Sequence, residues 1–554
     1  MMEDEKKLQD IPRTEPPQNE KVTDVASKTP AQDEDYDKYP HGVALWVITA
    51  ALYSTLFLVA LDRTIIATAI PAITDRFSSI SDISWYASAY LITSCSTQLL
   101  WGRVFTFYST KIVYLGCVIL FEVGSALCGA APSSTAFIIG RAISGIGAAG
   151  ITAGSTIIVT QIVPLSKRPV FVGSLGAVFG ISSIVGPLLG GAFTDHVSWR
   201  WCFYINLPFG AVVFAALVFY LKVEELSHEN ASLPLAKKLL QLDPLGTFVF
   251  LPGMICLLLA LQWGGVEYPW SDGRIITLFV LAGVFIIAFI GIQIWRKEAA
   301  TVPPRIVKQR SIFFGCFYSL LMGGCMLVLI YTLPIWFQAV KKTSAVQSGI
   351  NMFPLTIGMV LGVIPAGIVV QKTGYYVPPM FFCVVVTSIA VGLITTWEVG
   401  TSSAKWIGYQ AMFGIGLGAG MQQAVMAAQT VLPQVDVAIG VALMFFFQNL
   451  GAAIWICISQ TLFVNYLSSH LANIKGLDIG SVVHAGATEL SRIVPLDKMQ
   501  EVLEVYNDAL IQAIYVSVGL CCALIIPTLG MEWKSVKAKE QVKSQAEPAP
   551  EAEV

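Results

Sequence analysis

Charged residues are scarce in this chain of 554 residues. Only 13% of the residues are Asp, Glu, Lys or Arg, whereas 55% are hydrophobic. A surface facing water cannot be built from that balance, so we expect lipid to be the solvent of most of the chain. The formal net charge of -2 argues against nucleic acid as a partner.

The sequence patterns of the common enzyme sites are missing as well. The chain has five histidines and carries no phosphate loop, no His-Glu-x-x-His pair and no nucleophile elbow. We therefore expect no enzymatic activity, no cofactor and no metal. Most of the 11 cysteines lie inside apolar runs, where they read as small core residues with no disulfide scaffold.

Long hydrophobic runs dominate what remains. From His41 onward, runs of about 20 apolar residues alternate with short polar or Gly/Pro-containing breaks, and such a run crosses a hydrocarbon core of about 30 Å. The sequence predicts an all-α polytopic membrane protein with fourteen spans, near residues 43–71, 84–102, 112–131, 135–161, 170–192, 201–221, 246–264, 275–295, 312–333, 348–370, 377–397, 405–427, 438–464 and 509–530.

The segments outside the spans suggest an orientation. Residues 1–42 are polar and should be a disordered cytoplasmic tail, like residues 531–554. Basic residues are about twice as frequent in the short loops on the side of the N-terminus, which makes both termini cytoplasmic. The sequon Asn230-Ala231-Ser232 then faces the cytoplasm unused, and the extracellular loop 465–508 should end in a surface helix, Leu496 to Tyr506.

An internal repeat supports a halved transporter. Arg141 with Gly145 and Gly147 reappears as Gln410 with Gly414 and Gly416, and each run is followed by a proline. The repeat predicts six-helix bundles at 43–222 and 312–530, joined by a cytoplasmic linker and two inserted helices at 223–311. The turn at Gly102 has a weaker echo at Gly367. Chance matching of glycine-rich helices is the alternative.

Four segments resemble the 14-spanner drug:proton antiporter family of the major facilitator superfamily, and within it the fungal toxin and secondary-metabolite efflux pumps. They are Leu61-Asp62-Arg63-Thr64-Ile65-Ile66, Gly140-Arg141 with Gly145 and Gly147, Gly186-Pro187-Leu188-Leu189-Gly190-Gly191, and Trp199-Arg200-Trp201 through Asn206-Leu207-Pro208. The resemblance implies a major facilitator fold with 14 transmembrane helices. It also implies proton-coupled efflux of a toxic metabolite or amphiphilic drug. One departure is that the loop 102–111 has no carboxylate, which puts a salt-bridged inner gate there in doubt.

Ionisable residues inside spans are costly and are therefore candidates for function. Asp62 and Arg141 lie at depths that differ by about 5 Å, a gap that an arginine side chain can cover. A carboxylate whose arginine partner is present in one conformation and withdrawn in another could exchange protons. The alternative is a fixed structural salt bridge. Glu122, in the middle of span three, is a second proton-coupling candidate, with a buried, protonated or hydrogen-bonded glutamate as its alternative.

Small residues gather on one face of span five. Gly176, Gly180, Gly186, Gly190 and Gly191 lie on this face together with Pro187, which permits bending. In the resembling family this motif accompanies antiport. We therefore predict a hinge and seal between the halves, and plain tight packing is the alternative.

A substrate surface is expected in the second half. Its candidates are residues with amide or aromatic side chains, namely Gln410, Gln422, Tyr331, Trp336, Gln448 and Asn449. The expected partners are a small-molecule substrate, protons and the lipid bilayer, and we expect a monomer. The plasma membrane is the expected location, with a vacuolar or vesicle membrane as an alternative. A proton-coupled importer, for example of siderophores or basic amino acids, and a transporter-derived sensor remain alternative functions.

Overall fold

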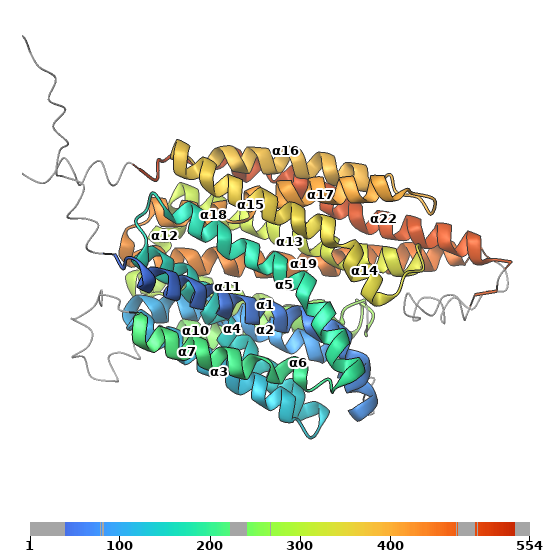
Figure 1. Ribbon diagram of the computed structural model, residues 1–554, viewed down its shortest axis with the longest axis horizontal. Helices are drawn as coiled ribbons and strands as arrows, with labels where there is room; N and C mark the ends of the chain where they lie inside the picture. Colours follow the sequence, from blue (N-terminus) through green and yellow to red (C-terminus); the bar gives the residue numbers. More distant parts are fainter. Residues whose placement is uncertain are drawn as a thin grey trace, which may run out of the picture. The chain divides into compact units, whose positions relative to one another are not determined.

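The computed structural model describes residues 39–537 apart from positions 78, 80–81, 222–240, 266, 473, 475–493 and 496. The described secondary structure is helical, with a single isolated bridge between Gly264 and Tyr268. Figure 1 shows the helices as a bundle of long rods with roughly common direction. The sequon, residues 475–493 of the loop 465–508, and most of the two tails lie outside the described residues.

The helices of the first half follow one another with short connections. Their bounds are α1 (Val43–Phe77), α2 (Ile83–Phe107), α3 (Thr110–Ala130), α4 (Ser134–Ile162), α5 (Arg168–His196), α6 (Trp201–Tyr204) and α7 (Asn206–Tyr220).

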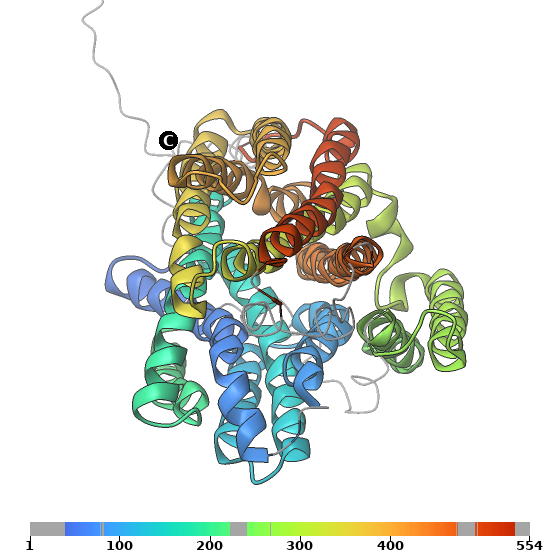
Figure 2. The same ribbon diagram turned by 90° about the vertical axis from the view of Figure 1, so that its right-hand side faces the viewer.

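Two long helices stand between the halves in the sequence. They are α10 (Pro244–Trp263) and α11 (Gly273–Arg296), followed by the short η2 (Lys297–Ala299) and α12 (Pro304–Lys308). Helix α10 contacts α2 and α19, whereas α11 packs on α10. Figure 2, which looks along the bundle, shows this pair at its periphery.

The second half begins at α13 (Arg310–Ala339). It continues with α14 (Ala345–Asn351), α15 (Phe353–Thr373), α16 (Val377–Ile394), α17 (Ser403–Met421), α18 (Gln423–Val431), η3 (Gln434–Asp436), α19 (Val437–Leu471), α22 (Met499–Ala523) and α23 (Ile525–Gly530). Helices α17 and α18 replace the single span expected at 405–427, because the helix is interrupted at Gln422.

Twelve helical segments of the described chain are long and apolar enough to cross a membrane. Helices α2 and α17 are not among them, although both are long enough. Helix α2 carries serines, threonines and Gln98, and α17 is rich in glycine, so neither helix contains a stretch as apolar as those of the twelve. The chain is thus an all-helical membrane protein, while the predicted count of fourteen spans exceeds the twelve that hydropathy identifies.

Each half repeats the same set of helix contacts. Helix α1 packs on α5 and α7, as α13 packs on α19 and α22; α4 packs on α2 and α3, as α17 packs on α15 and α16. The repeated glycines have matching roles: a methyl group at Gly145 would overlap the backbone of α2, and one at Gly414 would overlap the backbone of α15. Gly147 and Gly416 face α3 and α16 in the same way.

Two glycines at repeat-related positions also make contacts between the two halves. Gly102 of α2 faces Ala438 and Ala442 of α19, and Gly367 of α15 faces Pro169 of α5. Both contacts lie at the end of the bundle where α1 begins, which we call the N-terminal side. The weak echo between Gly102 and Gly367 in the sequence therefore corresponds to equivalent positions where the halves meet.

Helices α15 and α17 approach each other through glycine. A methyl group at Gly358, Gly362, Gly414 or Gly418 would overlap a backbone carbonyl oxygen of the opposite helix. Small residues at a spacing of four allow such close approach in lipid, where packing replaces the hydrophobic effect as the force between helices. This contact fixes the core of the second half.

One expectation about the outer loop is wrong. Residues 499–506 of the segment predicted as a surface helix, Leu496 to Tyr506, are the first part of α22, which runs without a break from Met499 to Ala523. Val502, Leu503 and Tyr506 are buried in the main hydrophobic core. The apolar face of this segment packs against the bundle, so it extends the last span.

The close approach of α15 and α17 gives a stability prediction. Gly362→Ala should lower the free energy of unfolding by about 1–3 kcal/mol, because its methyl group must displace the carbonyl of Ile415. Gly392→Ala in α16 is the matched control, since no atom lies within 4 Å of its added carbon. Thermal unfolding of the purified protein in detergent measures both, and an equal response of the two variants would contradict the prediction.

Candidate functional site

The structure brings Asp62 of α1 and Arg141 of α4 together. Arg141 Nη1 lies 2.5 Å from Asp62 Oδ2, and the two side chains are 1% and 0% exposed. The helical rise predicts that the two residues have similar depth, and the arginine side chain covers the remaining gap. The pair is therefore a fully buried ion pair within the first half.

Arg141 has further partners, whereas Asp62 has few. Arg141 Nε donates to the carbonyl oxygen of Tyr86 at 2.9 Å, and its guanidinium lies 4.5 Å from the ring centroid of Tyr90 and 5.9 Å from that of Phe203. Asp62 Oδ1 is buried and has no hydrogen-bond partner among the described residues. One carboxylate oxygen is thus available for a proton or a water molecule.

Glu122 lies apart from this pair, on α3. Its carboxylate faces Gly210 of α7, where a methyl group would overlap Glu122 Oε1. Both carboxylate oxygens are buried without a hydrogen-bond partner in the described part of the chain. Glu122 is therefore not part of the Asp62 pair. Without a hydrogen bond to its carboxylate among the described residues, a buried, protonated glutamate and a proton-coupling site both remain as interpretations.

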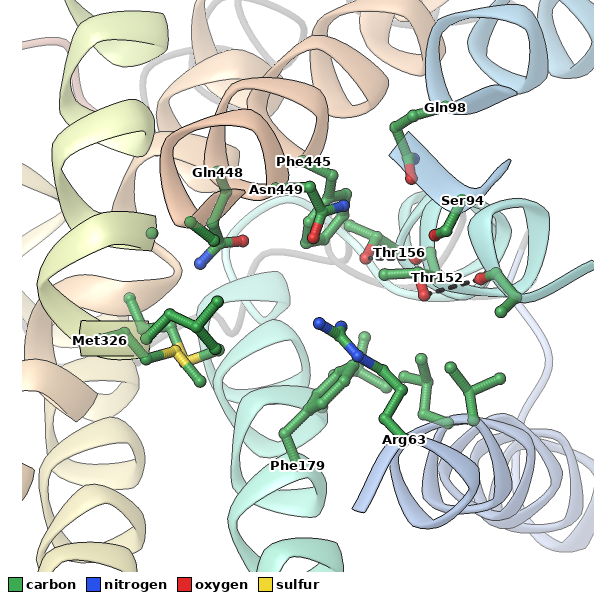
Figure 3. A pocket seen from close by; sticks show the side chains of 18 of the residues that line it. Arg63, Ser94, Gln98, Thr152, Thr156, Phe179, Met326, Phe445, Gln448 and Asn449 are labelled. Atoms are coloured by element: carbon green, nitrogen blue, oxygen red, sulfur yellow. Dashed lines mark hydrogen bonds between the residues drawn. The ribbon is translucent and has the colours of Figure 1, made fainter. Parts of the chain in front are cut away.

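A cavity lies where the two halves face each other, and we call it the central cavity. Its polar lining includes Arg63 of α1, Ser94 and Gln98 of α2, Thr152 and Thr156 of α4, and Gln422, Gln448 and Asn449 from the second half. Figure 3 labels these side chains, apart from Gln422, around the space between α1, α4, α5 and α19. At about 80 Å³ it is smaller than the pockets of about 300–1,000 Å³ that hold drug-sized ligands, so this conformation is too closed for such a ligand.

A second cavity of about 150 Å³ adjoins the first. The two share Arg63, Ser94 and Asn449 in their linings, and Tyr331 lines only the second. It extends along α2, α10 and α19 to Ser88 and Gln460, away from the N-terminal side. The contacts of Gly102 and Gly367 therefore close one end of the path between the halves, while the cavities extend toward the other.

Two expected cavity residues lie elsewhere. Trp336 is fully buried, donates from Nε1 to Asn507 Oδ1 at 2.8 Å and packs against Trp397. Gln410 is also fully buried and lines neither cavity. Trp336 was selected for its side-chain type and Gln410 for its repeat relation to Arg141, but the packing of α13 and α17 buries both side chains in the interior of the second half.

Arg63 is the main residue that the sequence analysis overlooked. It follows Asp62 directly, so its side chain leaves α1 at about 100° from that of Asp62 and enters the cavity. The rule that selected Asp62, an ionisable residue inside a span, applies equally to Arg63. Phe179, Met326 and Met421 also line the cavity without having been expected there.

The glycines of α5 face different partners along the helix. Gly176 and Gly180 face Gln422 and Met359 of the second half. Gly186 and Gly190 instead face α1 of their own half, where added methyl groups would overlap the hydroxyl groups of Thr64 and Thr68. A methyl group added at Gly349 would lie 3.6 Å from Pro187, and one added at Gly191 would lie 4.0 Å from Val346. The first part of this face therefore meets Gln422 and α15 of the second half, whereas Pro187 and Gly191 lie near α14 of the same half.

Charged residues form a network on the N-terminal side. Arg103 of α2 donates to the carbonyl oxygens of Gln241 and Glu298, both at 3.1 Å. Arg305 of α12 holds Asp436 with two hydrogen bonds of 2.5 and 2.8 Å. Arg103 thus uses backbone oxygens in place of the carboxylate that the loop 102–111 lacks.

Asp243 anchors the start of α10 in this network. It accepts hydrogen bonds from Gln293 Nε2, Gly246 N and Thr301 N, and pairs with Arg296 at 3.1 Å. Burial opposes the ionised form, but these hydrogen bonds outweigh it and hold the pKa of Asp243 below its usual value. The inserted helices are therefore tied to the N-terminal side by an ionised, well-coordinated carboxylate.

Two repeat-related helical halves with a polar cavity between them define a secondary transporter of the membrane. The comparisons agree. The Major Facilitator Superfamily family model matches residues 52–456, and the chain belongs to this superfamily. It is accordingly an integral membrane transporter and not an enzyme.

Curated relatives cover nearly the whole chain. The rubrofusarin-specific efflux pump aurT of Gibberella zeae is 51% identical over 508 residues, which are 92% of this chain and 93% of the relative. The MFS-type efflux pump MFS1 of Arthroderma benhamiae is 49% identical, covering 94% and 98%. The efflux pump aflT of Aspergillus parasiticus is 47% identical, covering 90% and 97%.

Solved structures share the fold at low identity. The proton:xylose symporter XylE has a TM-score of 0.53 and 11% identity, covering 89% of this chain and 98% of its own. A bacterial homologue of the human lysosomal transporter Spinster, in an inward-facing conformation, has a TM-score of 0.53 and 14% identity, covering 92% and 100%.

The buried pair predicts a characteristic pattern of stability. Arg141→Met should lower the free energy of unfolding by about 3–5 kcal/mol, because it leaves Asp62 as a buried charge without its partner. Adding Asp62→Leu removes both charges and should recover most of that loss. Arg274→Met, at the exposed start of α11, is the control and should change little. Thermal unfolding measures the series, and a double variant as unstable as Arg141→Met would contradict the pairing argument.

Proposed function

We propose that this protein exports small amphiphilic molecules by alternating access, driven by protons that enter and leave at Asp62. The observation that carries the proposal is the buried pair of Asp62 and Arg141, in which one carboxylate oxygen is unpaired. The relatives named as efflux pumps support export over import. The name of aurT makes rubrofusarin, a secondary metabolite, the first substrate to test.

Tyr90 connects the pair to the substrate path. Its ring covers the guanidinium of Arg141 on one side and lines the central cavity on the other. Rotation of this ring would give water access to Asp62, and protonation of Asp62 would release Arg141 from its counter-ion. In this mechanism the proton and the substrate occupy neighbouring sites separated by one aromatic side chain.

The contacts at the N-terminal side would act as the inner gate. Opening to that side must separate Gly102 from α19 and Gly367 from α5, together with Gly176 and Gly180 from Gln422 and Met359. We assign the sealing role to this part of α5. Gly186, Pro187, Gly190 and Gly191 serve as the flexible part of the hinge, where α5 lies close to α1 and α14.

Glu122 is proposed as an auxiliary proton site. Its two unpaired oxygens are favourable only if the carboxyl group carries a proton in this conformation. It contacts α7 and does not line either cavity, so it would act on the conformation of the first half rather than on the substrate.

The repeated contacts support bundles at 43–222 and 312–530, with the linker and two inserted helices at 223–311. Fourteen spans follow if α2 and α17 also cross the membrane, and their contacts with long spanning helices favour this. Their polar and glycine-rich faces would be covered by α4, α15 and α19 rather than by lipid. Both tails would be cytoplasmic, in a monomer of the plasma membrane.

Residues on both sides of α17 can test the span count. A cysteine at Thr401 should react with a membrane-impermeant thiol reagent on intact cells, whereas one at the exposed Val435 should react only after permeabilisation. The native exposed Cys522 is replaced in both variants. Equal reactivity of the two positions from one side would exclude α17 as a span.

Asp62→Asn tests proton coupling. The amide retains the shape of the side chain but cannot carry a proton, so uphill export of rubrofusarin into vesicles with an imposed proton gradient should be lost. Substrate binding and flux down a concentration gradient should persist. Glu501→Gln, at the exposed start of α22, is the control. Undiminished uphill export coupled to proton release in Asp62→Asn would remove Asp62 from the mechanism.

A further inference from the structure

The central cavity contains an arginine without a counter-ion. Arg63 has no hydrogen bond, ion pair or ring contact with any residue in the described part of the chain. Asp62, the nearest carboxylate in sequence, points in a different direction from α1 and is paired with Arg141. The positive charge of Arg63 is therefore left facing the cavity, as Figure 3 shows.

The other lining residues do not neutralise this charge. Among the residues that line the central cavity and the second cavity, Arg63 is the charged side chain, and no Asp or Glu occurs. The polar neighbours are neutral amides and hydroxyl groups, including Gln98, Gln448 and Asn449. A charge inside a membrane protein is costly unless it is paired, so the site is complete only when a ligand supplies the negative charge.

We infer that Arg63 is the substrate anion site, and that the transported molecules bind as flat aromatic anions carrying a carboxylate or an ionised hydroxyl group. This inference rests on the proposed function, because it names the chemical class that the exporter accepts. The planar guanidinium offers paired N–H donors that match a carboxylate.

The chemistry of the remaining lining matches the rest of such a ligand, which a more open conformation of the cavity would admit. Phe179, Tyr90 and Phe445 provide aromatic surface beside Arg63, and Met326 and Met421 provide adaptable apolar surface. Gln448 and Asn449 can bond to ring oxygens on the far side of the ligand. Since Arg63 and Asn449 line both cavities, the anion stays on the same arginine while the aromatic body moves from one cavity to the other.

The test is a binding measurement on the purified full-length protein. The probes are 1-hydroxy-2-naphthoate, an anion at neutral pH, its uncharged methyl ester, and the lipophilic cation tetraphenylphosphonium. In Arg63→Gln the affinity for the anion should fall by about tenfold or more, the loss of one charge-assisted hydrogen-bond pair, while the ester should bind as before. Arg63→Lys keeps the charge and should retain most of the affinity for the anion.

Two further variants control for misfolding and for nonspecific effects of changing a charge. Asn449→Asp keeps Arg63 but adds a carboxylate to the cavity lining, so it should also weaken the anion and favour the cation. Arg274→Gln removes a guanidinium at the exposed start of α11, outside both cavities, and should bind all three probes as the unaltered protein does.

Several outcomes would overturn the inference. These are an equal loss of anion and ester in Arg63→Gln, no loss of the anion, or a preference of the unaltered protein for the cation. Binding is measured without a proton gradient, so failure of proton coupling at Asp62 would not produce any of them. Conversely, rubrofusarin export that persists in Arg63→Gln would leave the exporter function standing and refute only the anion site.

Discussion

A charged side chain inside a membrane protein is costly to bury unless it is paired. In the first half, the ion pair of Asp62 and Arg141 meets this requirement. It joins α1 to α4 at a depth where neither water nor lipid could solvate either group. Tyr86, Tyr90 and Phe203 surround the arginine, so the helices that carry them are positioned by it. In the proposed mechanism a proton on Asp62 breaks this pair, and the aromatic residues around Arg141 then lose the contact that orders them, which would favour a change of conformation.

The second half has the same helix contacts but a different chemistry. Gln410 occupies the repeat position of Arg141 and is fully buried, with neither amide atom hydrogen-bonded among the described residues. A neutral amide costs less to bury unpaired than an arginine does. The repeat therefore preserves packing, seen in the matching glycines of α4 and α17. The ion pair formed by Arg141 has no counterpart at Gln410.

The sequence predicted the features that depend on one helix at a time. Span positions follow from apolar runs, and the encounter of Asp62 with Arg141 follows from helical rise, which applies before any packing is known. The sequence did not predict which neighbours each face of a helix meets, because that depends on how the helices pack. Trp336 has the right chemistry for a cavity but faces Asn507, whereas Arg63 went unnoticed beside Asp62 although it enters the cavity. The polar residues of α2, such as Ser94 and Gln98, lower the hydropathy of this helix. The same residues line the cavity between the halves.

The inserted helices have a consequence for lipid access. In a two-half bundle, the seam between α2 and α19 would be open to the acyl chains of the bilayer wherever the halves separate. Here α10 contacts both helices, and its Leu258, Leu261 and Gln262 form part of the wall of the second cavity. A ligand held there is shielded from the bilayer on that flank. Under the proposed export function, α10 would prevent a lipid-soluble substrate from re-entering the bilayer through this flank before its release into water.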